Sequence, residues 1–400
     1  MTISANRREF LGAAGALVIT FDITDPALAQ QPQAPRLPGD LNLAPKVSSW
    51  LRIEAGGKVR LLVGKVEIGQ GILTAVAQLC ADELSIDLKR LEVTSGDTRL
   101  VPNEGVTAGS FSMPNCGTAV RAVAADARRI LLDLAAQKLG APANALKIAD
   151  GRVTAPDGKS VTYWDLVSGA EFEVNATGNA PFLPAAERKY IGKSVVRLDI
   201  PPKVTGGPVW IQDLRPAGML HGRVLRPPVY DAKLVALDVS GVEKQAGVVK
   251  IVRDGSWVGV IAEREEQAID AIDALRRLAR WDVPAKSETH DTVYDWMQAQ
   301  PSQDLFIHDK KSNGATPVAA TVEQTYRRPY HMHASIGPST AIATLDGDVM
   351  RIQSHSQSIF ETTEAIAEML GMSKANVHGQ HVQGSGCYGH NGADDAAADA

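Results

Sequence analysis

Apolar residues in the first third of the chain follow two spacings, that of strands and that of helices. Between residues 50 and 63, alternating apolar positions flank Gly56-Gly57, which predicts a β-hairpin. Apolar residues then recur at helical spacing over residues 73–84 and 117–139, which predicts two amphipathic helices.

The remaining pattern predicts further strands and helices. A strand is expected at residues 91–93, a small β segment at 147–168, and later strands at 219–225, 234–239, 248–252, 257–262, 319–326, 339–345, 349–354 and 376–382. Helices are expected at 264–279 and 359–370. Polar stretches that contain Pro or Gly predict a linker at 30–46, a domain boundary at 171–186 and a connector at 284–316.

The N-terminus has the features of a targeting segment. Arg7-Arg8 precede an apolar stretch at 12–21 and a small-x-small site at 27–29, which together predict a twin-arginine export signal over residues 1–29. We therefore expect a periplasmic protein. The apolar stretch is shorter than the roughly 20 residues of a stable membrane span. The alternative is a frayed N-terminal helix of a cytoplasmic protein.

Composition excludes several classes of protein. The 400 residues carry a formal net charge of -5, and only 5% are aromatic, so a nucleic-acid partner is not expected. The three cysteines, Cys80, Cys116 and Cys387, are widely spaced. They predict no disulfide framework, zinc site or iron–sulfur cluster in this chain.

Glycine turns carry most of the functional information. Gly69, Gln70 and Gly71 lie between a predicted strand and a predicted helix, where free backbone N–H groups favour an anion such as a phosphate. A plain strand-to-helix turn is the alternative. Two further turns lie at residues 107–110 and 384–392, and the second matches neither a P-loop nor a dinucleotide fingerprint.

Taken together, these motifs resemble those of one family, and the likeness covers residues 50–400. The cofactor-binding pattern of molybdenum hydroxylase large subunits is similar to residues 67–71, 96–98 and 107–110. Their α/β hammerhead domain is similar to residues 205–214, 218–222 and 226–228. The segments that meet the pterin and the metal's oxo group resemble Ser356-Gln357 and residues 384–389. The early position of residues 67–71 is typical of the isoquinoline 1-oxidoreductase-like branch of the xanthine dehydrogenase/aldehyde oxidase superfamily.

The resemblance implies a set of site residues. Phosphate or pterin would be bound by Gly69, Gln70 and Gly71, and the nucleotide end by Thr107, Gly109 and Ser110. Gln357 would hydrogen-bond near the molybdenum, and His333 would line the substrate pocket. The turn against the pterin would consist of Gly384, Gly386, Tyr388 and Gly389. The pterin dithiolene holds the metal in this family, so no protein metal ligand is expected.

The resemblance also implies a fold and a reaction. The fold would be α+β, with molybdopterin-binding segments at 47–170 and 316–400 and an inserted hammerhead domain at 187–283. The cofactor would be molybdopterin cytosine dinucleotide. The reaction would hydroxylate an N-heteroaromatic compound or oxidise an aldehyde with oxygen from water. Electrons would leave through a separate small [2Fe–2S] subunit, with a cytochrome c as a further acceptor.

Departures from the family pattern limit these expectations. The turn at 384–389 is one residue longer than usual, and Gly337-Pro338 replace the family's Glu-Pro. No acidic residue suited to purines follows Gly389, which argues against xanthine as substrate. The family's catalytic glutamate has no counterpart here, and the pattern at 391–400 is that of a helix start, so we expect a C-terminally truncated chain that is inactive alone. A disordered alanine-rich tail, a non-catalytic cofactor-binding or assembly partner, and a different exported enzyme such as a flavin oxidoreductase are the alternatives.

Overall fold

The computed structural model describes residues 36–54, 56–167, 170–284, 288–303, 305–307, 320–390 and 394–400. These residues form two compact units, the first from the chain up to Arg215 and from Ser335 onward, the second from Pro216 to Ala334. Both units mix helices and strands, which confirms the predicted α+β class. The predicted export signal lies outside the described residues. No helix in the described part of the chain is long and apolar enough to cross a bilayer.

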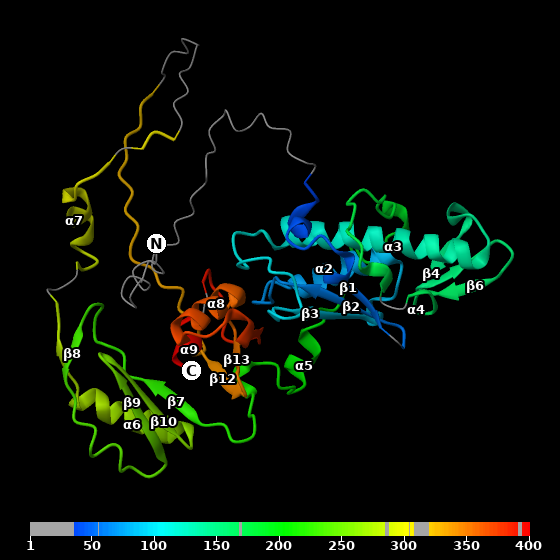
Figure 1. The fold of residues 1–400 in the computed structure, drawn as a ribbon. Coiled ribbons are helices and arrows are strands. Elements are labelled where there is room, and N and C mark those ends of the chain that lie inside the picture. Colours follow the sequence, from blue (N-terminus) through cyan, green and yellow to red (C-terminus); the bar gives the residue numbers. More distant parts are fainter. Residues whose placement is uncertain are drawn as a thin grey trace, which may run out of the picture. The chain divides into compact units, whose positions relative to one another are not determined.

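A three-stranded sheet and two helices build the centre of the first unit (Figure 1). The predicted hairpin is confirmed as antiparallel β1 (Leu51–Glu54) and β2 (Lys58–Val63), and β3 (Leu91–Ser95) pairs in parallel with β2. The parallel pairing requires a crossover, and α2 (Ile72–Leu84) supplies it. The predicted second helix is α3 (Thr118–Leu139), which packs against α2.

The core lies between these helices and the sheet. It includes Trp50, Val76, Cys80, Val123 and Leu131, all with no exposed surface. Burial of these side chains supplies the main driving force for this part of the fold. The 3-10 turn Gly39–Asn42 adds the fully buried Leu41 to the same core, so this part of the predicted linker belongs to the packed unit.

The segment predicted as a domain boundary also packs on the first unit. It follows the small sheet of β4 (Lys147–Ala149), β5 (Arg152–Thr154) and β6 (Ser160–Thr162) and the short α4 (Tyr163–Leu166). The carboxylate of Asp126, buried in α3, accepts hydrogen bonds from the backbone N–H and hydroxyl of Thr177 (2.7 and 2.6 Å). The predicted limits at 170, 187 and 283 stay predictions, while the compact units of the structure divide at Arg215.

The last part of the chain returns to the first unit. Strands β12 (Ala341–Asp346), β13 (Val349–Ser354) and β14 (Val377–His381) form a sheet packed by α8 (Ile359–Leu370) and α9 (Asp394–Asp399). β14 runs parallel to β13 and antiparallel to the chain that leaves β3. There Thr98 N–H donates to Gly379 O (3.0 Å), and His381 N–H donates to Gly96 O (2.8 Å). Thr98 and Gly379 are 281 residues apart in the chain.

The second unit contains a separate sheet and helix. Its antiparallel strands are β7 (His221–Val224), β10 (Trp257–Ala262) and β9 (Val248–Asp254), and α6 (Glu265–Leu278) packs on them. The pair β8 (Lys233–Ala236) and β11 (Arg280–Asp282), and α7 (Val293–Ala299), complete it. A further short helix, α5 (Ile200–Val204), belongs to the first unit.

One predicted strand is wrong. Residues 320–335 contain no strand, although we predicted one over 319–326. Val322 and Tyr326 are exposed there. Apolar alternation favours a strand only where a neighbouring strand supplies hydrogen bonds and a sheet face buries the side chains, and neither occurs along this segment.

A buried acidic cluster joins three loops of the first unit. The Glu104 carboxylate accepts hydrogen bonds from the N–H groups of Gly64 (2.6 Å) and Lys65 (3.3 Å). The side chains of Asp40 and Cys116 lie within hydrogen-bond reach of it. Among the described residues, Oδ2 of Asp40 and Oε1 of Glu104 are buried without a hydrogen-bond partner. Burial raises the pKa of Glu104 to about 7, and the Asp40 carboxyl adds to this effect.

Replacing Gly96 by Ala should destabilise the first unit. Gly96 has a φ of +60°, and a Cβ there would lie 2.6 Å from atoms of both His381 and Val66. We expect a loss of about 2–4 kcal/mol in the free energy of unfolding, measured in urea, from backbone strain plus overpacking. Gly347→Ala is the matched control, because Gly347 has a φ of +57° with no atom within 4 Å, so it should lose only about 1 kcal/mol. Equal losses in both variants would show that the Gly96 contact is unimportant.

Replacing Glu104 by Gln should flatten the pH dependence of stability. Because the folded-state pKa is raised, folded protein binds more protons than unfolded protein between about pH 4.5 and 7, so wild-type stability falls as pH rises through that window. The slope is at most about 1.4 kcal/mol per pH unit for one group. Thermal midpoints from pH 4.5 to 8 measure it. Glu92→Gln, which alters a half-exposed carboxylate on the sheet, should keep the wild-type slope. A Glu104→Gln profile parallel to that of the wild type would contradict the raised pKa of Glu104.

Candidate functional site

The turn at Gly69–Gly71 is closed by a buried carboxylate from within the chain. Glu67 is 1% exposed, and its Oε1 accepts hydrogen bonds from the N–H groups of Gly69 (2.9 Å) and Gly71 (2.8 Å). Both glycines have positive φ, and Gly71 caps the N-terminus of α2. A helix N-terminus favours an anion, and at α2 that anion is the carboxylate of Glu67 from the same chain.

Gln70 folds back onto the same turn. Its Oε1 accepts from the N–H of Ile68 (2.7 Å), and its Nε2 donates to Val66 O (2.9 Å). The side chain is exposed, and the Nε2 group has a second hydrogen. A Cβ on Gly69 would meet no atom within 4 Å, so the turn is open on that side.

Arg197 ties this turn to a second acidic residue. Its guanidinium donates to Gly69 O (2.9 Å) and Glu67 Oε1 (3.3 Å), and it forms a two-bond pair with Asp199 (2.9 and 2.7 Å). Lys203 Nζ also donates to Asp199 (2.6 Å). Burial opposes ionisation of Asp199, but the hydrogen bonds from Arg197 and Lys203 outweigh it and lower the pKa of Asp199 to about 2.

Thr107 and Gln357, predicted from separate motifs, lie side by side. Thr107 N–H donates to Gln357 O (2.8 Å), and Gln357 Nε2 donates to Thr107 O (2.9 Å). The Thr107 hydroxyl accepts from the N–H of Val66 (3.0 Å). Both side chains are buried, at 3% and 5% exposure, so they hold three loops together.

The glycine turn after β14 packs against the same region. Cys387 Sγ donates to Gln357 Oε1 (3.5 Å), and Ser335 Oγ donates to Gly386 O (2.7 Å). Gly384 leaves no room for a side chain, because a Cβ there would lie 2.5 Å from the His355 ring. Tyr388 and Gly389 are exposed at the end of the turn.

His381 links the two sides of the site. Its Nδ1 lies 3.0 Å from Ser356 O, and its Nε2 lies 3.1 Å from Glu67 O. Burial lowers the pKa of His381, so the neutral ring donates to one of these two carbonyls at a time.

Asp97 anchors the start of β14 to the loop after β3. Its carboxylate lies 2.8 Å from His378 Nε2 and accepts a hydrogen bond from Gln380 Nε2 (2.9 Å). Burial opposes ionisation, but the bonds from Gln380 and His378 outweigh it and lower the pKa of Asp97. The motif at 96–98 thus has a structural role in joining the two halves of the first unit.

The remaining predicted site residues, Gly109, Ser110 and His333, are all exposed. Gly109 and Ser110 are exposed, both with positive φ, on the loop that follows Thr107. His333 is exposed and belongs to the second unit, whereas the other predicted residues belong to the first.

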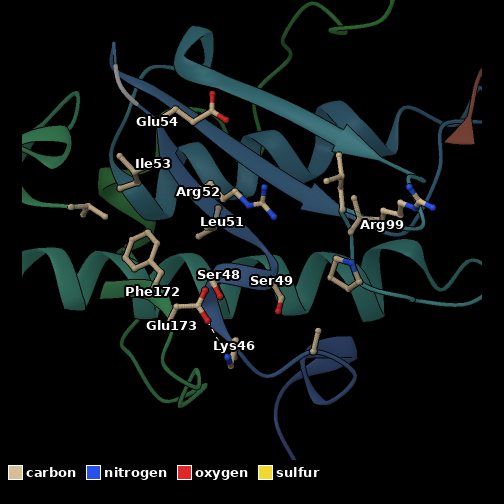
Figure 2. Close-up of a pocket in the computed structure, with 15 residues that line it drawn as sticks. Lys46, Ser48, Ser49, Leu51, Arg52, Ile53, Glu54, Arg99, Phe172 and Glu173 are labelled. Carbon is tan, nitrogen blue, oxygen red and sulfur yellow. Dashed lines mark hydrogen bonds and ion pairs between the residues drawn. The ribbon is translucent and has the colours of Figure 1, made fainter. Parts of the chain in front are cut away.

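A cavity of about 620 Å³ lies between β1 and residues 99–102 of the loop after β3 (Figure 2). It runs beside β1, an edge strand, with Arg52 and Arg99 labelled on its walls. None of the site residues predicted from the sequence lines it. The cavity therefore supplies no argument for the cofactor site.

The loops fit a polar, anionic cofactor. They present an open glycine turn at Gly69, the Gln70 amide, and the exposed residues Gly109, Ser110 and Gly389. Glu67, beside the turn, is matched by Arg197 and by backbone N–H groups and so would not repel an anion strongly.

Sequence reasoning missed the residues that hold the site. The linking contacts come from Arg197, His381 and the Glu67 carboxylate. Arg197 and His381 lie in no predicted motif, and Glu67, the first residue of the motif at 67–71, was given no role. A glutamate two residues before a glycine turn was the one usable signal, because its short spacing suits a bond to the turn's N–H groups.

Comparisons with known proteins agree with the motifs. Residues 13–194 match the molybdopterin cofactor-binding domain family. The chain is 33% identical over 408 residues to a nicotinate dehydrogenase chain of Pseudomonas putida, covering 99% of this chain and 34% of that one. It is 28% identical to a membrane-bound aldehyde dehydrogenase of Gluconacetobacter polyoxogenes whose name specifies pyrroloquinoline quinone, covering 88% and 48%.

A third relative is the isoquinoline 1-oxidoreductase beta subunit of Brevundimonas diminuta, 26% identical over 73% of this chain and 42% of that one. The chain thus spans between a third and a half of the length of these relatives. Residues 13–194 thus match a molybdopterin cofactor-binding domain, and the chain is similar to part of these molybdenum hydroxylase large subunits.

Proposed function

We propose that this chain is the molybdopterin-binding part of an oxidoreductase that hydroxylates an N-heteroaromatic compound or oxidises an aldehyde. The observation that carries the proposal is the reciprocal hydrogen bonding of Thr107 and Gln357. It brings the turn at Gly69–Gly71 and the turn at Gly384–Gly389 onto one region of the first unit. Hydrogen bonds thereby link four motifs that are far apart in sequence.

The residues present have distinct parts in holding the cofactor. The Gln70 amide and the open side of Gly69 would meet its polar end, and Ser110 and Gly109 would meet the nucleotide. Tyr388 and Gly389 would cover the pterin. When bound, the cofactor supplies a molybdenum centre that transfers oxygen from water and accepts two electrons.

The finer identity of cofactor and substrate follows the relatives. Nicotinate and isoquinoline enzymes favour an N-heteroaromatic substrate, and the aldehyde dehydrogenase favours an aldehyde. We propose molybdopterin cytosine dinucleotide as the cofactor form. We also propose a small [2Fe–2S] partner subunit, a cytochrome c acceptor and twin-arginine export to the periplasm, on the sequence features given above.

A non-catalytic cofactor-binding partner is the second candidate. The two buried glutamates beside the described loops, Glu67 and Glu104, are both engaged internally, so neither is placed as a general base. Neither Glu67 nor Glu104 can therefore serve as the proton acceptor that hydroxylation needs.

The first experiment measures molybdenum and acid-released CMP per chain, in protein purified from its own host. Near-stoichiometric amounts of both are expected. Folded protein with neither would overturn the molybdopterin proposal, and molybdenum without CMP would overturn the cytosine dinucleotide form. Turnover of nicotinate-like and aldehyde substrates then separates the enzyme from the non-catalytic partner, since the loaded partner would turn over neither.

Gln357→Glu should lower cofactor content. The substitution is isosteric, but it places a carboxylate oxygen opposite Thr107 O, where an N–H donated before. Loss of this buried bond should reduce molybdenum per chain by about tenfold. Gln353→Glu, a half-buried position on β13, is the control and should stay near wild type. If the wild-type protein is fully loaded with molybdenum and Gln357→Glu contains the same amount, the Thr107–Gln357 contact does not shape the site.

A further inference from the structure

The turn at Gly69–Gly71 depends on an ion pair from a distant part of the chain. The buried carboxylate of Glu67 accepts hydrogen bonds from the N–H groups of Gly69, Gly71 and, at 3.4 Å, Leu73. A buried carboxylate is stable only when it is matched by hydrogen bonds and an opposite charge. Arg197 supplies that charge, 130 residues further along the chain.

Arg197 contacts both the carboxylate and the backbone of the turn. One N–H reaches Gly69 O at 2.9 Å, and another reaches Glu67 Oε1 at 3.3 Å. A planar guanidinium can make these bonds and pair with Asp199 at once, which a lysine ammonium cannot. Arg197 therefore holds the carbonyl of Gly69 and Glu67 holds its N–H, so the peptide units on both sides of Gly69 are fixed.

Asp199 fixes the guanidinium itself. Its carboxylate is 7% exposed and is held by both Arg197 and Lys203. Lys203 in turn lies over the Trp210 ring, 4.9 Å from the centroid. This arrangement restricts the Arg197 side chain, which is one-third exposed, to the orientation that meets the turn.

We propose that Arg197 is a positioning residue that, through Glu67, holds the Gly69–Gly71 turn in its cofactor-binding shape. A second consequence concerns the ligand. The N–H groups of Gly69 and Gly71 face Glu67, so the cofactor meets the Gln70 side of the turn and its phosphate is not bound by these two N–H groups. This inference rests on the proposed cofactor function.

The test compares Arg197→Met with Arg90→Met in full-length protein from the same host. Arg90 is a matched control, because it forms a two-bond pair with Asp150 (2.7 and 2.7 Å) and has almost the same exposure, 32% against 33%. The readouts are molybdenum and CMP per chain, the thermal midpoint, and hydrogen–deuterium exchange of the Gly69 and Gly71 amides. Arg197→Lys is the second variant, in case Arg197→Met does not fold.

We expect Arg197→Met to lose about tenfold in cofactor content and to exchange the Gly69 and Gly71 amides about tenfold faster. Arg90→Met should match wild type in both, with a similar change in thermal midpoint. Arg197→Lys should retain intermediate cofactor, because the charge remains but only one partner can be reached at a time. Wild-type content and exchange in either Arg197 variant would overturn the positioning role.

The proposed function can fail separately. Wild-type protein without molybdenum and CMP would refute that function, while amide exchange would still decide whether Arg197 holds the turn. Loaded wild-type protein, together with an Arg197→Met variant that is as loaded as Arg90→Met, would refute the positioning role alone.

Discussion

The candidate site depends on keeping one negative charge, that of Glu67, buried at the start of α2. Its carboxylate accepts from the N–H groups of a turn whose two glycines have positive φ, and its backbone carbonyl faces His381. Without a matched partner, such a charge would be too costly to bury, and the turn would have to open toward water. Arg197 supplies the match, so a local turn is coupled to a segment 130 residues away.

Similar buried polar groups join the other segments of the first unit. Asp97 connects the loop after β3 with β14, and the Asp40–Glu104 pair connects the turn at Gly39–Asn42 with the end of β2. Apolar burial between sheet and helices makes this unit stable, but it does not distinguish sharply between nearby placements of the loops. Hydrogen bonds to buried charges do distinguish these placements, because they are directional and a wrongly placed loop leaves the buried charge without its partners.

The arrangement also affects how the glycine turn is interpreted. A glycine turn at a helix N-terminus is a well-suited anion site, and the sequence hypothesis assigned a phosphate to it. In the structure, the carboxylate of Glu67 accepts the hydrogen bonds from Gly69 and Gly71 that a bound anion would accept. What remains for a ligand is the other side of the turn, with the Gln70 amide and the space above Gly69. A motif can thus mark the right region while its usual chemistry is performed internally.

The sequence by itself determined the local elements and the chemistry of the turns. The alternation over residues 50–63 and the helical spacing over 117–139 led to β1, β2 and α3, because a hairpin and a long amphipathic helix are decided mainly by residues close together in the chain. The same local logic failed for the strand predicted over 319–326, because the described residues 320–326 pair with no neighbouring strand. Only the tertiary structure decided that Thr107 meets Gln357, that Arg197 meets Glu67 and that the segment at 171–186 packs on α3. These contacts join positions 51 to 250 residues apart. No periodicity encodes them, because which distant loops meet depends on how all the elements pack together.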